Sequence, residues 1–160
     1  MRLTIAAIGR LKEGPDRELF QRYWTRFEAA GKKIALHPLR LIELPESRAS
    51  TVTLRRADEA TRLDAASAGR DFTIALDENG RQVSSPAFAA LLAKRRDAGA
   101  RDLALLIGGP DGHGAGILDK ADLVLGLGAM TFPHGLARVL VAEQLYRAST
   151  ILIGHAYHRA

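Results

Sequence analysis

Hydrophobic residues in this chain fall into short continuous runs separated by stretches with helical spacing. Continuous apolar runs between glycine, proline or polar residues are typical of strands that are buried on both faces of a parallel sheet. One run contains Pro38, which predicts an edge strand or a bulge because proline cannot donate a hydrogen bond to a neighbouring strand. The predicted strands cover residues 3–8, 34–44, 72–76, 103–107 and 123–127.

Four helices are predicted between and after these strands. The first is framed by Pro15 and Gly31, and Ser85 followed by Pro86 supplies the third with an N-cap and a proline at its first position. The predicted helices cover residues 15–31, 50–68, 85–98 and 134–149, and a separate apolar run follows at residues 151–153.

Strands that alternate with helices predict an α/β fold with a mainly parallel sheet and helices on both faces. The third strand is expected to end in a turn, because Asp77-Glu78-Asn79-Gly80 is a turn-forming combination. No repeat, low-complexity tract or linker interrupts the chain, so we expect one domain over residues 1–160.

Composition excludes several classes of protein. Hydrophobic residues make up 47% and charged residues 26% of the 160 residues, which is ordinary for a folded protein. The absence of cysteine excludes a disulfide scaffold, an iron–sulfur cluster, thiol chemistry and the common cysteine-bearing zinc sites. No run approaches the roughly 18–20 apolar residues of a membrane span, and the first residues lack a signal-peptide pattern. We therefore expect a cytoplasmic protein without a membrane partner.

The positive charge is concentrated in the first two-thirds of the chain. The whole sequence carries a formal charge of +5, but residues 1–101 carry +6 and the remainder carries −1. Eighteen of the 23 cations are arginines, which suit forked contacts with phosphate. This asymmetry makes a nucleic acid a candidate partner and places Arg55 and Arg56 on its binding surface. A basic surface that only aids solubility is the alternative.

Three of the predicted strands end in segments that could meet at one ligand site. In open α/β sheets, ligands bind beyond the carboxyl ends of the strands, and glycines there let a ligand approach the backbone. Neither a Walker A motif nor a dinucleotide-binding glycine pattern fits, so no standard nucleotide motif explains them. The segments are residues 76–80, 107–114 and 126–134.

The last helix and the tail carry the remaining candidate residues. His134 and Arg138 are four residues apart on one helical face, and a buried Arg138 needs an anion or acceptors on this chain, a partner subunit or a ligand. The tail after Gly154 contains two histidines, a tyrosine and an arginine, a set that is used for unpaired bases and phosphates, although a frayed tail has the same composition. No metal is expected, because no acidic or cysteine partner lies near His155 and His158.

Several of these segments resemble the ribosomal RNA large subunit methyltransferase H family, within the SPOUT class of methyltransferases. The resemblance spans the whole chain and is most specific in its C-terminal third. It is carried by Leu3-x-Ile5-x-Ala7-x-Gly9, Thr73-x-Ala75-Leu76-Asp77, Leu105-Leu106-Ile107-Gly108-Gly109-Pro110-Asp111-Gly112, Met130-Thr131-Phe132-Pro133-His134, the run from Arg138 to Ala148, and Tyr157-His158-Arg159.

The resemblance implies a fold, a reaction and a set of partners. The expected fold is a SPOUT-type α/β knot, in which the C-terminal part is threaded into a trefoil. The expected activity is methylation of N3 of a pseudouridine in helix 69 of 23S rRNA, in the assembled ribosome. The expected cofactor is S-adenosyl-L-methionine, and the expected assembly is a homodimer. The sequence also leaves open a non-catalytic rRNA-binding module or an α/β enzyme that uses another adenosine ligand.

The resemblance also assigns residues to the site. The implied cofactor-binding residues are Leu76, Gly108, Gly109, Leu127, Gly128, Ala129, Met130, Thr131 and Phe132. The implied candidates for aligning the substrate or removing the N3 proton, drawn from both subunits, are His134, Arg138, Tyr157, His158 and Arg159.

Overall fold

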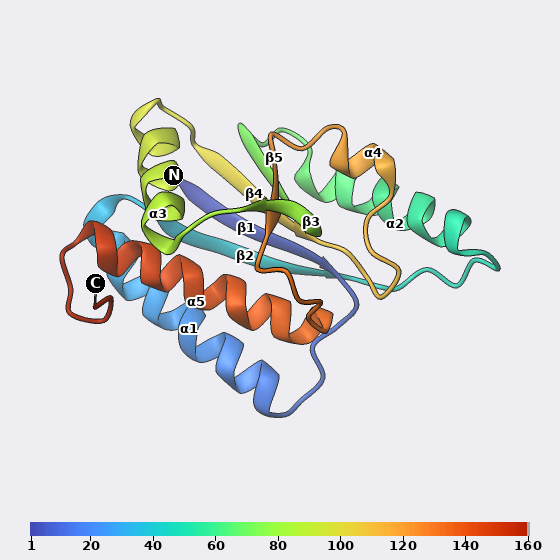
Figure 1. Cartoon of the computed structure of the whole chain (residues 1–160), viewed down its shortest axis with the longest axis horizontal. Helices are drawn as coiled ribbons and strands as arrows, with labels where there is room; N and C mark the ends of the chain where they lie inside the picture. The colour runs from blue at the N-terminus through green and yellow to red at the C-terminus, as the bar shows by residue number, and fades with distance from the viewer. Residues whose placement is uncertain (160) are drawn as a thin grey trace.

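A single five-stranded sheet forms the centre of the fold, with strand order β2-β1-β4-β3-β5 (Figure 1). The computed structural model describes residues 1–159. Every neighbouring pair of strands is parallel, which confirms the predicted sheet type. The strands are β1 (Arg2–Ile8), β2 (His37–Leu44), β3 (Phe72–Gln82), β4 (Asp102–Ile107) and β5 (Leu123–Gly126).

Helices cover both faces of the sheet, as predicted (Figure 1). One face packs against α1, α3 and α5, while α2 and α4 lie against the other. The α-helices are α1 (Pro15–Gly31), α2 (Val52–Ser67), α3 (Ser85–Asp97), α4 (Ala115–Leu118) and α5 (His134–Leu152).

Alternating side chains of the central strands supply two separate hydrophobic cores. In β4, Leu103 and Leu105 belong to the core under α1, α3 and α5, whereas Ala104 and Leu106 belong to the core under α2 and α4. Because successive side chains of a strand point to opposite faces, a strand between two helical layers is apolar at nearly every position, and the buried Thr4 of β1 is an exception. This requirement explains the continuous apolar runs in the sequence.

The region between α1 and β2 differs from the prediction, because the strand begins at His37 rather than at residue 34. Residues 32–34 instead form a 3₁₀ helix (Lys32–Ile34), and Ala35 has a left-handed backbone with φ of 52°. This turn brings Leu36 so close to Gly31 that a Cβ at Gly31 would lie 2.1 Å from the Leu36 carbonyl oxygen. The register of β1 with β2 shifts beside Pro38, and β2 is an edge strand, so the expected bulge and edge position are both confirmed.

The predicted turn at residues 77–80 is wrong, because β3 continues through it to Gln82. The register between β3 and β5 shifts between Leu76 and Arg81, so the segment is an irregular part of the strand. A Cβ on Gly80 would lie 2.5 Å from the Leu125 carbonyl carbon. The glycine therefore permits close contact between two strands instead of reversing the chain.

Helix ends also differ from the prediction by one or more residues. Ser84, not Ser85, caps α3, and its hydroxyl accepts a hydrogen bond of 3.3 Å from the Ala87 N–H. Helix α5 continues through the apolar run at residues 151–152, and the short helix α4 was not predicted. The threading of the C-terminal part into a trefoil stays a prediction of the family resemblance. No helix in residues 1–159 combines the length and apolar character needed to cross a membrane.

Candidate functional site

The carboxyl ends of β4 and β5 lie on either side of Leu76, the point in β3 after which its pairing becomes irregular. Leu76 of β3 is paired with Ile107 of β4 on one side and with Leu125 of β5 on the other. The segments that follow these positions therefore begin at the same edge of the sheet. They are the three segments that sequence reasoning grouped into one candidate site.

The glycine loop after β4, residues 108–114, is folded tightly against its own chain. Gly109 and Gly112 form an antiparallel bridge, and the Gly112 N–H donates a 3.0 Å hydrogen bond to the Gly109 carbonyl. A Cβ on Gly109 would lie 2.9 Å from Cγ2 of Ile8, and one on Gly108 would lie 3.0 Å from the Gly112 carbonyl carbon. The chain's own packing therefore leaves little room for a side chain at positions 108 and 109.

The loop after β5 is hydrogen-bonded to β3, and Gly128 is its least crowded glycine. The Thr131 hydroxyl donates a 2.7 Å hydrogen bond to Oε2 of Glu78, which joins the loop to the irregular part of β3. Gly128 has φ of 149°, and the nearest atom to its missing Cβ is a ring carbon of Phe132 at 4.0 Å. Of the glycines at positions 108, 109, 126 and 128, Gly128 is the one with open space beside it.

The predicted cofactor residues at this loop span a range of exposure. The side chain of Met130 is 76% exposed and that of Phe132 is 37% exposed, both high for apolar residues. Leu127 is half-buried and lines a pocket of about 200 Å³ together with Leu125, Gly126 and residues of α3 and α5. The structure places Leu76, Gly108, Gly109 and Gly128 in half-buried positions and Ala129 and Thr131 in exposed ones.

His113 is buried beneath these strand ends, and sequence reasoning did not identify it. Its side chain lies against the backbone of Leu76 and Leu106, and among residues 1–159 neither ring nitrogen has a partner with hydrogen-bond geometry. Burial lowers the pKa of His113 below its ordinary value of 6.5, despite the nearby backbone groups and the charge of Asp77, which act to raise it. The neutral imidazole is the stable form in this position.

Arg138 is completely buried where α5 crosses the ends of β1 and β2. Its Nη1 donates a 3.0 Å hydrogen bond to Oε1 of Glu43, and its Nη2 donates to the carbonyl of Ile8. Burial lowers the pKa of the Arg138 guanidinium, while the charges of Glu43 and Glu46 act to raise it. Its own chain therefore supplies acceptors for two of the three nitrogens, while the buried Nε has no hydrogen-bond partner in residues 1–159.

His134 lies next to Arg138, around Gly9. A Cβ on Gly9 would lie 3.3 Å from Nε2 of His134, 3.4 Å from Nη2 of Arg138 and 3.0 Å from Oε1 of Glu46. The φ of Gly9 is 84°, a conformation that favours glycine. Sequence reasoning missed both Glu43 and Glu46, although their position at the carboxyl end of a predicted parallel strand was a usable signal.

The tail folds back onto the middle of α5. The Tyr157 hydroxyl donates a 2.9 Å hydrogen bond to Glu143, and the Tyr157 ring lies 4.6 Å from that of Tyr146. Arg147 lies 4.8 Å above the Tyr157 ring and donates to Glu143 through Nε at 2.9 Å. Burial, followed by hydrogen bonding to Tyr23 and Glu143, raises the pKa of Tyr157. The segment through Tyr157 is therefore docked rather than frayed.

Within a single subunit, the tail residues lie far from His134. Glu143, the anchor of Tyr157, follows His134 by nine residues on the same helix, a rise of roughly 13 Å. Figure 1 shows the C-terminus beside the far end of α5. His158 is half-buried and Arg159 is exposed. Residues 1–159 contain no group of three His, Asp or Glu side chains that could hold a metal ion.

The fold and these strand ends define a SPOUT methyltransferase. The family model described as a predicted SPOUT methyltransferase matches residues 1–158. A solved structure of a probable methylase family protein from Haemophilus influenzae Rd KW20 has a similar fold, with a TM-score of 0.52 and 13% sequence identity. The similarity covers 99% of this chain and 70% of that chain.

Curated relatives identify the family within this class. The chain is 49% identical over 169 residues to ribosomal RNA large subunit methyltransferase H of Brucella abortus (strain S19). It is 50% identical over 160 residues to the protein of the same name from Brucella anthropi, and both comparisons cover 100% of each chain. The chain belongs to the ribosomal RNA large subunit methyltransferase H family, which confirms the resemblance found in the sequence.

We predict that breaking the ion pair of Arg138 with Glu43 lowers the stability of the folded protein strongly. Glu43→Gln keeps an oxygen acceptor but removes the carboxylate charge bonded to the buried guanidinium and leaves Glu46 as its nearby counter-charge, so the free energy of unfolding should fall by about 3 kcal/mol. Urea denaturation followed by circular dichroism measures the change. Arg2→Gln is the control, because it removes an ion pair with Asp102 in which the Arg2 side chain is 56% exposed. A loss as large in the control would contradict the assigned importance of the buried pair.

The buried His113 predicts a pH dependence of folding. Because its pKa is lowered in the folded protein, the unfolded chain binds more protons as the pH falls below about 6.5. Its contribution to stability is therefore complete above that pH and declines below it. Urea denaturation from about pH 7.5 to 5.5 should give a shallower decline for His113→Gln than for the parent. His155→Gln, in the exposed part of the tail, is the control and should retain the parent slope.

Proposed function

We propose that this protein uses S-adenosyl-L-methionine to methylate N3 of a pseudouridine in helix 69 of 23S rRNA, in the assembled ribosome and as a homodimer. The proposal rests on the chain's membership of this rRNA methyltransferase family and on one structural observation. Strands β3, β4 and β5 pair side by side at the candidate site, and the Thr131 hydroxyl is hydrogen-bonded to Glu78 across it. The names of the relatives support an rRNA substrate, and the family resemblance supplies the particular base.

The residues at these strand ends fit the proposed cofactor. The open space at Gly128 and the exposed backbone of the loop around it suit an adenosine group, which hydrogen-bonds well to backbone amides and carbonyls. Asp77 and Glu78 place carboxylates nearby, and these suit a ligand with cationic amino and sulfonium groups. When bound, the cofactor supplies an electrophilic methyl group. The residues proposed to hold it are Leu76, Gly108, Gly109, Leu127, Gly128, Ala129, Met130, Thr131 and Phe132.

The protein's main task in this reaction is to align the base and to allow the N3 proton to leave. Orientation alone contributes several kcal/mol to such a transfer. His134, at the first position of α5, can accept a proton or a hydrogen bond, while Tyr157, His158 and Arg159 offer stacking, hydrogen bonding and positive charge. Arg138 has no exposed surface, so we assign it the role of fixing the beginning of α5 and thereby His134.

The distance between His134 and the tail supports the proposal of a homodimer. The tail is held at Glu143, more than two helical turns from His134, so a site that needs both must take the tail from a second subunit. The exposed apolar side chains near the start of α5, Met130, Phe132 and Leu136, are also unusual on the surface of a monomer.

A methyl-transfer assay tests the proposed substrate. Labelled S-adenosyl-L-methionine is supplied with intact pseudouridine-bearing ribosomes, with ribosomes lacking pseudouridine, or with free 23S rRNA. Transfer is expected with the first substrate alone, and mass spectrometry should locate the methyl group on N3. Equal methylation of free rRNA would contradict the requirement for an assembled ribosome. Failure to bind the cofactor in calorimetry, together with retained ribosome binding, would favour a non-catalytic rRNA-binding module.

Mixed dimers test whether the site is shared between subunits. His134→Ala and Arg159→Ala should each abolish methylation. After co-refolding in equal amounts, about a quarter of the parent activity should return, because half of the dimers are mixed and each has one intact site. A double variant with both changes in the same chain, co-refolded with the parent, gives the reference for random mixing. No recovery in the first mixture would contradict a composite site.

A further inference from the structure

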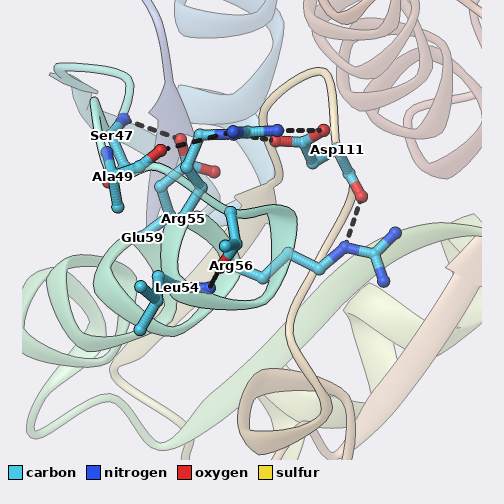
Figure 2. Close-up of polar contacts among 8 residues, drawn as sticks. Ser47, Ala49, Leu54, Arg55, Arg56, Glu59 and Asp111 are labelled. Carbon is cyan, nitrogen blue, oxygen red and sulfur yellow. Dashed lines mark hydrogen bonds and ion pairs between the residues drawn. The ribbon is translucent and has the colours of Figure 1, made fainter.

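Helix α2 contacts the glycine loop after β4 through a network of polar side chains (Figure 2). Arg55 donates from Nε to Oδ2 of Asp111 at 2.6 Å and from Nη2 to Oδ1 at 3.3 Å. The third nitrogen, Nη1, donates to the carbonyl of Ala49 at 3.3 Å. All three guanidinium nitrogens of Arg55 are therefore engaged within the chain.

Glu59 extends this network one helical turn further along α2. Its Oε1 accepts a 2.8 Å hydrogen bond from the Ser47 N–H, and the side chain is 4% exposed. Its Oε2 has no hydrogen-bond partner in the described part of the chain and would lie 3.0 Å from a Cβ on Gly109. Arg55 and Glu59 thus join the segment after β2 and the glycine loop after β4 to the same helix.

The neighbouring Arg56 is placed differently. Its Nε donates a 2.6 Å hydrogen bond to the Asp111 backbone carbonyl, as Figure 2 shows. Its Nη2 would lie 3.9 Å from a Cβ on Gly112, so the guanidinium stays beside the loop. The side chain is exposed and borders a groove of about 510 Å³ between α2 and α4, which Lys120 also lines. Within residues 1–159, Nη1 and Nη2 of Arg56 make no hydrogen bond and both are available for a phosphate, whereas every nitrogen of Arg55 already makes one.

The glycine loop has a particular need for such support. Four of its seven residues are glycines, at positions 108, 109, 112 and 114, and glycine loses more conformational freedom on ordering than any other residue. A loop that must be ordered when a ligand arrives binds that ligand more weakly than one that is ordered beforehand. The Arg55 and Asp111 side chains are only 28% and 26% exposed, so water screens their ion pair less than a fully exposed one.

We propose that Arg55 is a positioning residue for the cofactor site: its contacts with Asp111 and Ala49 hold the glycine loop in its binding conformation, and Arg56 is the adjacent contact for RNA phosphate. This inference rests on the proposed function, because it assumes that the loop after β4 contributes to cofactor binding. It revises the expectation that both arginines belong to the RNA-binding surface. The Glu59 carboxylate packs against the same loop at Gly109.

Calorimetry with S-adenosyl-L-methionine tests the positioning role. Arg55→Gln and Asp111→Asn should each raise the cofactor Kd by about tenfold, and the double variant should be no weaker than either single one because both remove the same pair. In turnover, KM for the cofactor should rise while kcat at saturating cofactor stays within about twofold of the parent. Arg62→Gln is the matched control: it removes an ion pair with Asp58 on the same helix and a 2.7 Å hydrogen bond to the Pro45 carbonyl, neither of which touches the glycine loop.

Hydrogen exchange and ribosome binding separate this role from general stabilisation and from RNA contact. Without cofactor, amides of residues 108–114 should exchange faster in Arg55→Gln than in the parent or in Arg62→Gln. Ribosome affinity should fall in Arg56→Gln, with a weaker salt dependence, and stay unchanged in Arg55→Gln. If Arg55→Gln does not fold, Asp111→Asn provides the same three measurements.

The outcomes distinguish the inference from the function on which it rests. A parent protein that does not bind the cofactor would overturn both. A parent that binds it, with unchanged affinity and unchanged loop exchange in Arg55→Gln and Asp111→Asn, would overturn the inference and leave the proposed function intact. Weaker ribosome binding by Arg55→Gln with unchanged cofactor affinity would assign Arg55 to the RNA surface instead.

Discussion

The position of α5 depends on the burial of one positive charge, the guanidinium of Arg138. A buried charge is tolerated only where acceptors and a counter-charge meet it, and here Glu43 of β2 and the Ile8 carbonyl of β1 do so. A shift of α5 along the sheet would separate these groups and leave the charge unpaired. The pair therefore fixes both the entry of α5 and the location of His134, and α1 and α3 pack against the helix placed in this way.

The opposite face of the sheet uses the same kind of interaction in a different environment. There Arg55 of α2 holds the loop after β4 through Asp111, in partial contact with solvent. The buried pair orders a helix, whose own hydrogen bonds already make it rigid. The half-exposed pair orders a loop with four glycines, which has little rigidity of its own. The edge of the sheet where the strand ends meet is thus supported from both helical layers.

The sequence predicts the layers well and the contacts between distant residues poorly. The largely apolar runs of β1 and β4, in which Thr4 of β1 is the one polar residue between Leu3 and Ile8, could be interpreted correctly because both faces of these strands are covered. The turn expected at Gly80 failed because turn propensity is local, while the close approach of Gly80 to Leu125 depends on strand pairing. In the same way, the sequence showed that Arg138 needs an acceptor but not that Glu43, 95 positions away, supplies it. The site could be predicted as a set of strand ends, and the partners that hold it could not.

In this fold, the number of glycines or arginines does not show which of them can contact a ligand. Gly108 and Gly109 are crowded by the chain's own packing, whereas the nearest atom to a Cβ on Gly128 is 4.0 Å away, so glycine content alone does not measure the room for a ligand. Arg55 and Arg56 contribute equally to the net charge, yet one has all of its nitrogens engaged and the other does not. Attraction of RNA at long range follows the net charge, but contact with phosphate needs free donors. Under the proposed function, the basic first two-thirds of the chain combines arginines that can approach RNA with arginines that shape the cofactor site, and their hydrogen-bond partners distinguish the two groups.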